Sequence, residues 1–196
     1  MHFDLQHIIH DYGYTGIAGA LFLEMIGIPF PGETLLTLSG IEWSKGTFSL
    51  LPLLVIAIVS NILGSTVAFL IGRSFGHTLI FRYGKAIGLT HERFEKAEAR
   101  FNKSPVILLI FAKFIAGVRV LVAYLAGINQ MSFVKFSVYN GIGTVLWITI
   151  FVVFGRYVEI GWEKYHLLLH QYLVPIVIVL AVIILYFISK RKRNPL

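Results

Sequence analysis

The sequence predicts an all-α integral membrane protein. We expect an inverted repeat of two re-entrant helical hairpins, each followed by a transmembrane helix, and one more transmembrane helix at the C-terminus. The 196 residues are 57% hydrophobic and only 14% charged, whereas about a quarter of an average soluble chain is charged. A soluble domain of this size cannot bury so much apolar surface. There is no cysteine, which excludes a disulfide-stapled fold.

The first apolar stretch, 12–41, is not an uninterrupted span. Its longest uncharged piece has 12 residues, well short of the roughly 20 that a membrane-crossing helix needs. It is interrupted by Glu24, by the turn residues Pro29, Pro31 and Gly32, and by Glu33. We therefore interpret 12–41 as the first re-entrant hairpin.

A second broken stretch occupies 105–128 and carries Lys113, Gly117 and Arg119. Irregular backbone at membrane depth is stable only where protein buries it or where it lines a wet cavity. The stretch is therefore predicted to be the second re-entrant hairpin, with Gly117 at its turn.

Three stretches are predicted to be transmembrane helices, at 50–72, 134–155 and 172–189. Residues 50–72 contain no charge over 23 positions. Two of these helices carry an asparagine followed three residues later by a glycine, a combination suited to polar support and close helix packing. These residues are Asn61 with Gly64 and Asn140 with Gly143.

Basic residues indicate the orientation of the chain. The segment 73–104 holds seven of the 17 Lys and Arg residues, so we expect a cytoplasmic loop that contains a short amphipathic helix. Gly72, Arg73 and Gly76 would form the cytoplasmic exit of the preceding helix. The tail 190–196 is also basic, which predicts a cytoplasmic C-terminus. With this placement of the cations, the net charge of +7 indicates membrane topology and no nucleic-acid partner.

A weak internal repeat follows the same map. Gly40 and Gly127 correspond at an offset of 87, and Gly72 and Gly155 at an offset of 83. Each unit is a broken hairpin followed by a spanning helix. Inverted repeats of broken helices that meet near the bilayer midplane are typical of transporters.

Two acids in the first hairpin are candidates for substrate and proton coupling. Glu24 and Glu33 lie nine residues apart across the double-proline turn. A carboxylate at bilayer depth is costly unless it is paired, hydrated or protonated, and burial favours its neutral form. The alternative for Glu33 is that it caps a helix starting near Thr34, since Pro31-Gly32-Glu33 resembles a helix start with an acid in its first turn.

Two cations in the second hairpin are the matching candidates for substrate binding. Lys113 and Arg119 lie six residues apart. Arginine presents a fork of donors that matches phosphate oxygens, and lysine supplies a point charge. Facing the two carboxylates, they would leave a buried site near neutral, which an anionic headgroup could enter by exchanging partners with the acids. A purely structural ion-pair cluster is the alternative, and it does not exclude the first interpretation.

The order of these motifs resembles the DedA family, the family of the SNARE-associated or VTT domain. The resemblance covers about 21–155 and rests on these motifs: Glu24-Met-Ile-Gly-Ile-Pro-Phe-Pro-Gly-Glu33, Gly72-Arg73-x-x-Gly76, Phe111-Ala-Lys-Phe-Ile-Ala-Gly-Val-Arg119, Ala126-Gly127-x-x-x-Met131, Asn140-x-x-Gly143 and Trp147.

The resemblance implies a multi-pass protein of the bacterial cytoplasmic membrane that moves lipids between leaflets. The implied cargo is undecaprenyl phosphate or phosphatidylethanolamine, carried by a flippase linked to the proton motive force or by a scramblase. Glu24 and Glu33 match the acidic positions of the family, and Arg119 matches its second basic position. Lys113 stands where the family commonly has arginine and keeps the charge without the fork.

Other functions are less well supported by the sequence. No Gly-x-Ser-x-Gly, His-Glu-x-x-His or Pro-Ser-Gly-His motif occurs, so we expect no catalysis. The histidines lack metal-ligand spacing, and we expect neither a metal nor a cofactor. A proton-coupled carrier of a small ion or solute stays open, as do a membrane-organising protein without transport and a homo-oligomer.

Overall fold

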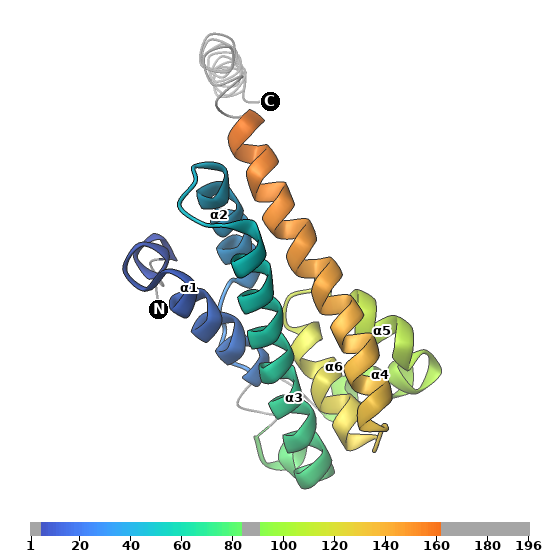
Figure 1. Ribbon diagram of the computed structural model, residues 1–196. Coiled ribbons are helices and arrows are strands. Elements are labelled where there is room, and N and C mark those ends of the chain that lie inside the picture. Colours follow the sequence, from blue (N-terminus) through green and yellow to red (C-terminus); the bar gives the residue numbers. More distant parts are fainter. Residues whose placement is uncertain (1–4, 84–90, 162–196) are drawn as a thin grey trace, which may run out of the picture. The chain divides into compact units, whose positions relative to one another are not determined.

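The computed structural model of the chain describes residues 5–83 and 91–161. Every regular element in these two ranges is helical, which confirms the all-α prediction (Figure 1). Within them, two helices are long and apolar enough to cross a membrane, Leu50–Gly76 with 27 residues and Phe133–Gly161 with 29.

The chain separates into two units, Met1–Arg156 and Tyr157–Leu196. All the site residues predicted from the sequence belong to the first unit. The predicted helix 172–189 and tail 190–196 lie outside the described residues, as do residues 84–90 of the predicted loop.

The first predicted hairpin is a broken pair of helices, α1 (Leu5–Ile26) and α2 (Gly32–Ser44). The non-helical link holds Pro29 and Pro31, which have no N–H to continue a helix. Pro31 directly precedes α2, where a missing N–H costs nothing because the first turn has no intrahelical acceptor for it. The helices α1 and α2 contact each other.

The second predicted hairpin is also broken. It consists of α5 (Pro105–Phe111), a 3₁₀ turn at Ala112–Phe114, and α6 (Val118–Ile128). Gly117 precedes α6 with φ +77°, a conformation that residues with a Cβ rarely adopt. The glycine therefore lets the chain turn sharply into α6.

Two helices extend past the ends that the charges predict. α3 (Leu50–Tyr83) continues beyond Gly72 and changes direction only at Gly76, where φ is +54°. The expected helix 134–155 runs on to Gly161. A charged residue such as Arg73 marks where a helix meets a polar environment, but it does not interrupt backbone hydrogen bonds. Gly72 and Arg73 are therefore inside α3, and of the three residues predicted at the helix exit only Gly76 lies at a change of direction.

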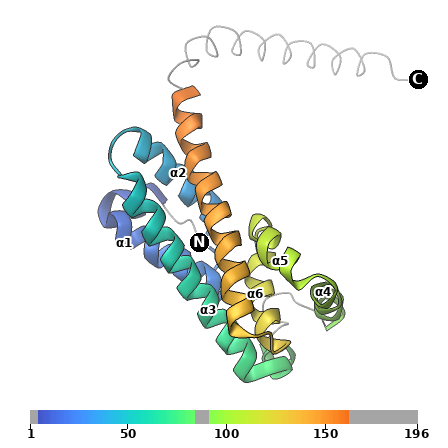
Figure 2. The same ribbon diagram turned by 45° about the vertical axis from the view of Figure 1, so that its right-hand side comes forward.

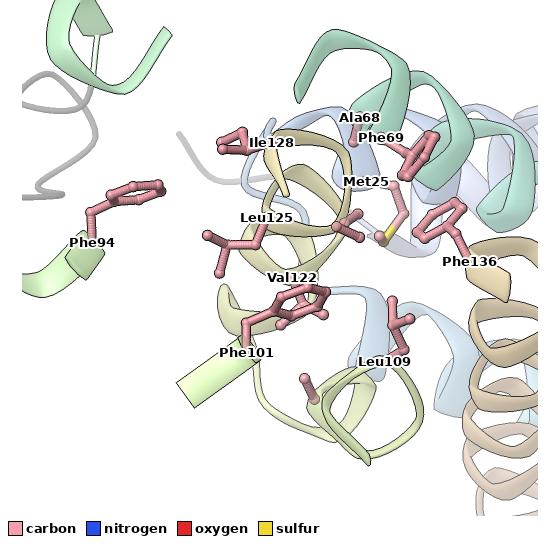
Figure 3. Packing of buried hydrophobic residues seen from close by; sticks show 13 residues of the cluster. Met25, Ala68, Phe69, Phe94, Phe101, Leu109, Val122, Leu125, Ile128 and Phe136 are labelled. Carbon is pink, nitrogen blue, oxygen red and sulfur yellow. The ribbon is translucent and has the colours of Figure 1, made fainter. Parts of the chain in front are cut away.

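The helix α4 (His91–Lys103) forms where the sequence predicts an amphipathic helix. Its buried Phe94 and Phe101 pack into a hydrophobic cluster with residues of α3, α5 and α6 (Figure 3). In the same cluster, Phe69 of α3 stacks on Phe136 with ring centroids 4.4 Å apart. Packing of one apolar face is what stabilises a short helix such as α4.

Two glycines show how closely α6 approaches α3, beside which it lies in both views (Figure 1 and Figure 2). A Cβ on Gly127 would collide with the carbonyl oxygen of Phe69, and one on Gly72 with that of Tyr124. Phe69 lies three residues before Gly72, and Tyr124 lies three residues before Gly127. The two contacts are therefore reciprocal. Only glycine allows such close backbone contact.

The same pattern recurs between α2 and the helix Phe133–Gly161. A Cβ on Gly40 would collide with the carbonyl oxygen of Val152, and one on Gly155 with that of Thr37. The second helix of each broken pair therefore packs on the long helix of the other half of the chain. The glycine pairs of the weak sequence repeat are thus structurally equivalent.

Alanine at Gly127 should destabilise the protein, because the added Cβ collides with backbone that cannot move freely. We expect a loss of about 1–3 kcal/mol, typical of overpacking. The matched control is Gly141→Ala, since Gly141 is also helical but has no atom within 4 Å of the added Cβ. Thermal unfolding in detergent should show a lower midpoint for Gly127→Ala and an unchanged or slightly raised one for Gly141→Ala. Equal midpoints would contradict the close crossing.

Candidate functional site

The site is centred on Arg119, which lies in the first turn of α6 directly after the break at Gly117. Its guanidinium donates to both carboxylate oxygens of Glu33, at 2.6 and 3.2 Å. It also donates to Oε1 of Glu24. The Arg119 side chain is 2% exposed. Two carboxylates thus share one buried guanidinium, and each bond is charge-assisted.

Glu24 approaches this guanidinium from the last turns of α1 and is 4% exposed. Its Oε1 also accepts the backbone N–H of Gly32 at 3.2 Å, across the break between α1 and α2. A Cβ on Gly32 would overlap the Glu24 carboxylate. The absence of a side chain at Gly32 therefore creates the space in which the carboxylate reaches the arginine.

Glu33 belongs to the first turn of α2, where the helix dipole favours a negative charge. Its side chain is 27% exposed, more than either Glu24 or Arg119. The expected capping of a helix near Thr34 is not seen, because α2 already begins at Gly32 after Pro31 and has no side-chain cap hydrogen bond. Glu33 forms the accessible edge of the cluster.

Lys113 lies in the 3₁₀ turn of the second broken pair and is 2% exposed. Its ammonium donates to Oδ1 of Asn61 on α3 at 2.9 Å. The same Oδ1 accepts the hydroxyl of Thr144 at 3.1 Å. The backbone carbonyl of Lys113 accepts from Arg119 at 3.4 Å, so the two cations belong to one network.

Asn140, the repeat counterpart of Asn61, donates from Nδ2 to the hydroxyl of Ser65 at 2.8 Å. Ser65 and Thr144 thus hold equivalent places, each four residues after an asparagine and each bonded to the asparagine of the other helix. Neither hydroxyl is among the residues predicted from the sequence. The Asn-x-x-Gly-Ser and Asn-x-x-Gly-Thr patterns of the repeat are the signal that could have found them.

Gly64 and Gly143, which follow these asparagines, allow the first helix of each broken pair to pack closely on a long helix. A Cβ on Gly64 would collide with the carbonyl oxygen of Phe22 in α1, and one on Gly143 would come within 2.9 Å of the backbone of Ile110 in α5. Each long helix therefore also packs closely on the first helix of its own half.

Trp147 lies directly against Arg119, whose guanidinium carbon is 4.5 Å from the centroid of the indole ring. The tryptophan side chain is fully buried. Stacking on an aromatic face suits a planar guanidinium and fixes its orientation. The sequence places Trp147 only among the family motifs and gives it no role at the site.

The charges of the cluster balance, with Glu24 and Glu33 against Lys113 and Arg119. All four charged residues predicted from the sequence therefore lie together. They come from the break between α1 and α2 and from the break between α5 and α6. Among residues 5–83 and 91–161, no three His, Asp or Glu side chains gather closely enough to hold a metal ion. This arrangement can bind an anion if the anion replaces one of the carboxylates at the Arg119 guanidinium.

The chain matches the VTT domain over residues 30–157. An uncharacterized membrane protein of Bacillus subtilis, YbfM, is 33% identical over 156 residues, which cover 80% of this chain and 96% of that protein. Undecaprenyl phosphate transporter A of the same organism is 31% identical over 93% of this chain and 90% of its own length. An alkaline phosphatase-like protein of Lactococcus lactis is 28% identical over 94% of this chain and 90% of its own length. No solved structure matches the chain significantly.

Replacing Arg119 with leucine should strongly destabilise the protein, because it leaves buried carboxylates without their cation. Breaking a buried pair in this way costs about 3–5 kcal/mol, which corresponds to a fall of about 10 °C in the unfolding midpoint. Adding Glu24→Gln to Arg119→Leu should recover part of the loss.

The control is Arg156→Leu, which removes an exposed arginine that lies over the ring of Trp43 at 4.2 Å and should cost about 1 kcal/mol or less. Thermal midpoints of the wild type and of each variant in one detergent make the comparison. Additive effects of Glu24→Gln and Arg119→Leu would mean that the two side chains are not coupled.

Proposed function

Because the chain belongs to the VTT-domain family, also called the DedA family, we propose that it is a transbilayer lipid transporter. Its cargo would be a phosphate-bearing lipid, such as undecaprenyl phosphate or phosphatidylethanolamine, in the cytoplasmic membrane of a bacterium. The buried cluster of Arg119, Lys113, Glu24 and Glu33 is the observation that carries the proposal. The name of the Bacillus subtilis transporter supports the choice of a polyprenyl phosphate.

The proposal includes two re-entrant hairpins that enter from opposite faces. At about 1.5 Å per residue, the 11 residues of α6 and the 13 of α2 span roughly 16 and 20 Å, short of a hydrocarbon core of about 30 Å. The equivalent glycine crossings in the two halves support an inverted repeat. In this topology the breaks meet near the midplane, and the C-terminus is cytoplasmic.

The cluster suits phosphate transfer because a phosphate at the bilayer centre is prohibitively costly without partners. Arg119 would hold phosphate oxygens through its fork, and Lys113 would add a second charge. The two carboxylates already occupy the guanidinium, so the headgroup would replace them. Glu33, at the accessible edge of the cluster, would exchange first.

Charge balance gives the reason for proton coupling. The cluster is neutral with both acids ionised, whereas a phosphate monoester carries between one and two negative charges near pH 7. Protonation of Glu24 or Glu33 would restore neutrality as such a headgroup entered. A zwitterionic headgroup brings no net charge and would need no proton.

Transport can be measured with the purified protein in liposomes, with a fluorescent polyprenyl phosphate as cargo and a pH gradient imposed or absent. We expect movement that the gradient accelerates and that Arg119→Ala reduces to the rate of empty liposomes. Arg156→Ala serves as the control for loss of an exposed arginine and should transport normally. Unreduced movement in Arg119→Ala would contradict the proposal, and release of inorganic phosphate from the lipid would identify a phosphatase instead.

The paired variant Glu24→Gln with Glu33→Gln tests the coupling separately. Glutamine keeps hydrogen bonding to Arg119 but cannot take up a proton, so transport of the phosphate monoester should lose its response to the gradient. Movement of a fluorescent phosphatidylethanolamine should not respond to the gradient even in the wild type. An unchanged pH dependence in the double variant would exclude these acids as the coupling groups.

A further inference from the structure

Four buried side-chain polar atoms of the described residues have no hydrogen-bond partner, and all four belong to the site. They are Oε2 of Glu24, Nδ2 of Asn61, Nε of Arg119 and Nε1 of Trp147. Leaving such a group unpaired in a protein interior costs about 1–3 kcal/mol. Such unpaired groups are rare in native proteins, and all four lie in one network.

Three of the four atoms are donors, and they lie on residues joined by direct contacts. Trp147 stacks on Arg119, Arg119 donates to the carbonyl of Lys113, and Lys113 donates to Asn61. Beside them, the Lys113 ammonium has three protons and can only donate. These buried groups offer more hydrogen-bond donors than acceptors. An anion with several oxygens would accept hydrogen bonds from the donors that have no partner.

The orientation of Asn61 is fixed by chemistry. Lysine cannot accept a hydrogen bond, so the asparagine atom that faces Lys113 must be Oδ1, and Nδ2 must face away from it. At the equivalent position in the other half, Nδ2 of Asn140 is occupied by its bond to Ser65. The two halves of the repeat differ here, and the free donor lies only on the Asn61 side of the pair.

We infer that Asn61 and Trp147 bind the phosphate oxygens of the transported headgroup together with Arg119 and Lys113. This inference rests on the proposed function and adds two uncharged donors to the charged pair. Asn61 Nδ2 and Trp147 Nε1 become paired only when the headgroup is bound. Trp147 therefore has two roles, since its ring face orients Arg119 and its N–H contacts the substrate.

The test measures equilibrium binding of farnesyl phosphate to the full chain in detergent micelles, with farnesol as the ligand that lacks phosphate. Trp147→Phe keeps an aromatic face for Arg119 and removes the N–H. Asn61→Asp keeps an oxygen for Lys113 and Thr144 and replaces the donor with an anionic acceptor. We expect binding of farnesyl phosphate to weaken about three- to tenfold in Trp147→Phe and at least tenfold in Asn61→Asp, with farnesol binding unchanged in both.

The matched control is Trp43→Phe, which makes the same change at a tryptophan that also stacks on an arginine, Arg156. It should bind farnesyl phosphate like the wild type. Wild-type affinity in Trp147→Phe would overturn the role of its N–H, even where Asn61→Asp fails to fold. Equal binding of farnesol and farnesyl phosphate by the wild type would overturn the inference as a whole.

The liposome assay separates this inference from the proposed function. Phosphate-dependent binding that needs Asn61 and Trp147, without lipid movement by the wild type, would support the inference and contradict transport. Lipid movement by the wild type that is as fast in both variants would support transport and contradict the inference.

Discussion

The pairing of one buried guanidinium with two carboxylates is the constraint on which the rest of the structure depends. Arg119, Glu24 and Glu33 come from three helices, and burying Arg119 or Glu24 without an opposite charge would be strongly destabilising. Their pairing therefore requires the break after α1 and the break before α6 to meet.

Close helix crossings make this meeting possible. The second helix of each broken pair (α2 or α6) packs on the long helix of the other half, and glycines in these helices contact backbone carbonyls. The two halves are thus packed against each other through both crossings.

The asymmetry between the halves is as informative as their likeness. Asn61 and Asn140 hold equivalent places, yet one accepts from a buried lysine and the other donates to a serine. The acids lie in the first half of the chain and the cations in the second. A repeat that is symmetric in packing thus surrounds a cluster in which each half supplies one sign of charge.

Much of the site could be predicted from the sequence because charges in apolar stretches are easily recognised. Glu24, Glu33, Lys113 and Arg119 are identifiable on that ground alone, and the prolines and Gly117 locate the breaks. Helix ends are less predictable. Charged residues such as Arg73 and Arg156 do not end a helix, so α3 and the helix Phe133–Gly161 extend beyond the apolar stretches.

By itself, the sequence determined the membrane character of the protein, its all-α class and the four charged residues, since each follows from local composition. Only the tertiary structure decided which charge pairs with which, that Trp147 stacks on Arg119, and that Asn61 contacts Lys113. The physical reason is that these contacts join residues far apart in the chain. Asn61 and Lys113 are 52 positions apart, and Glu24 and Arg119 are 95 apart. No local sequence pattern indicates which distant residue each of them will contact. Only the close crossings of the folded helices bring such residues together.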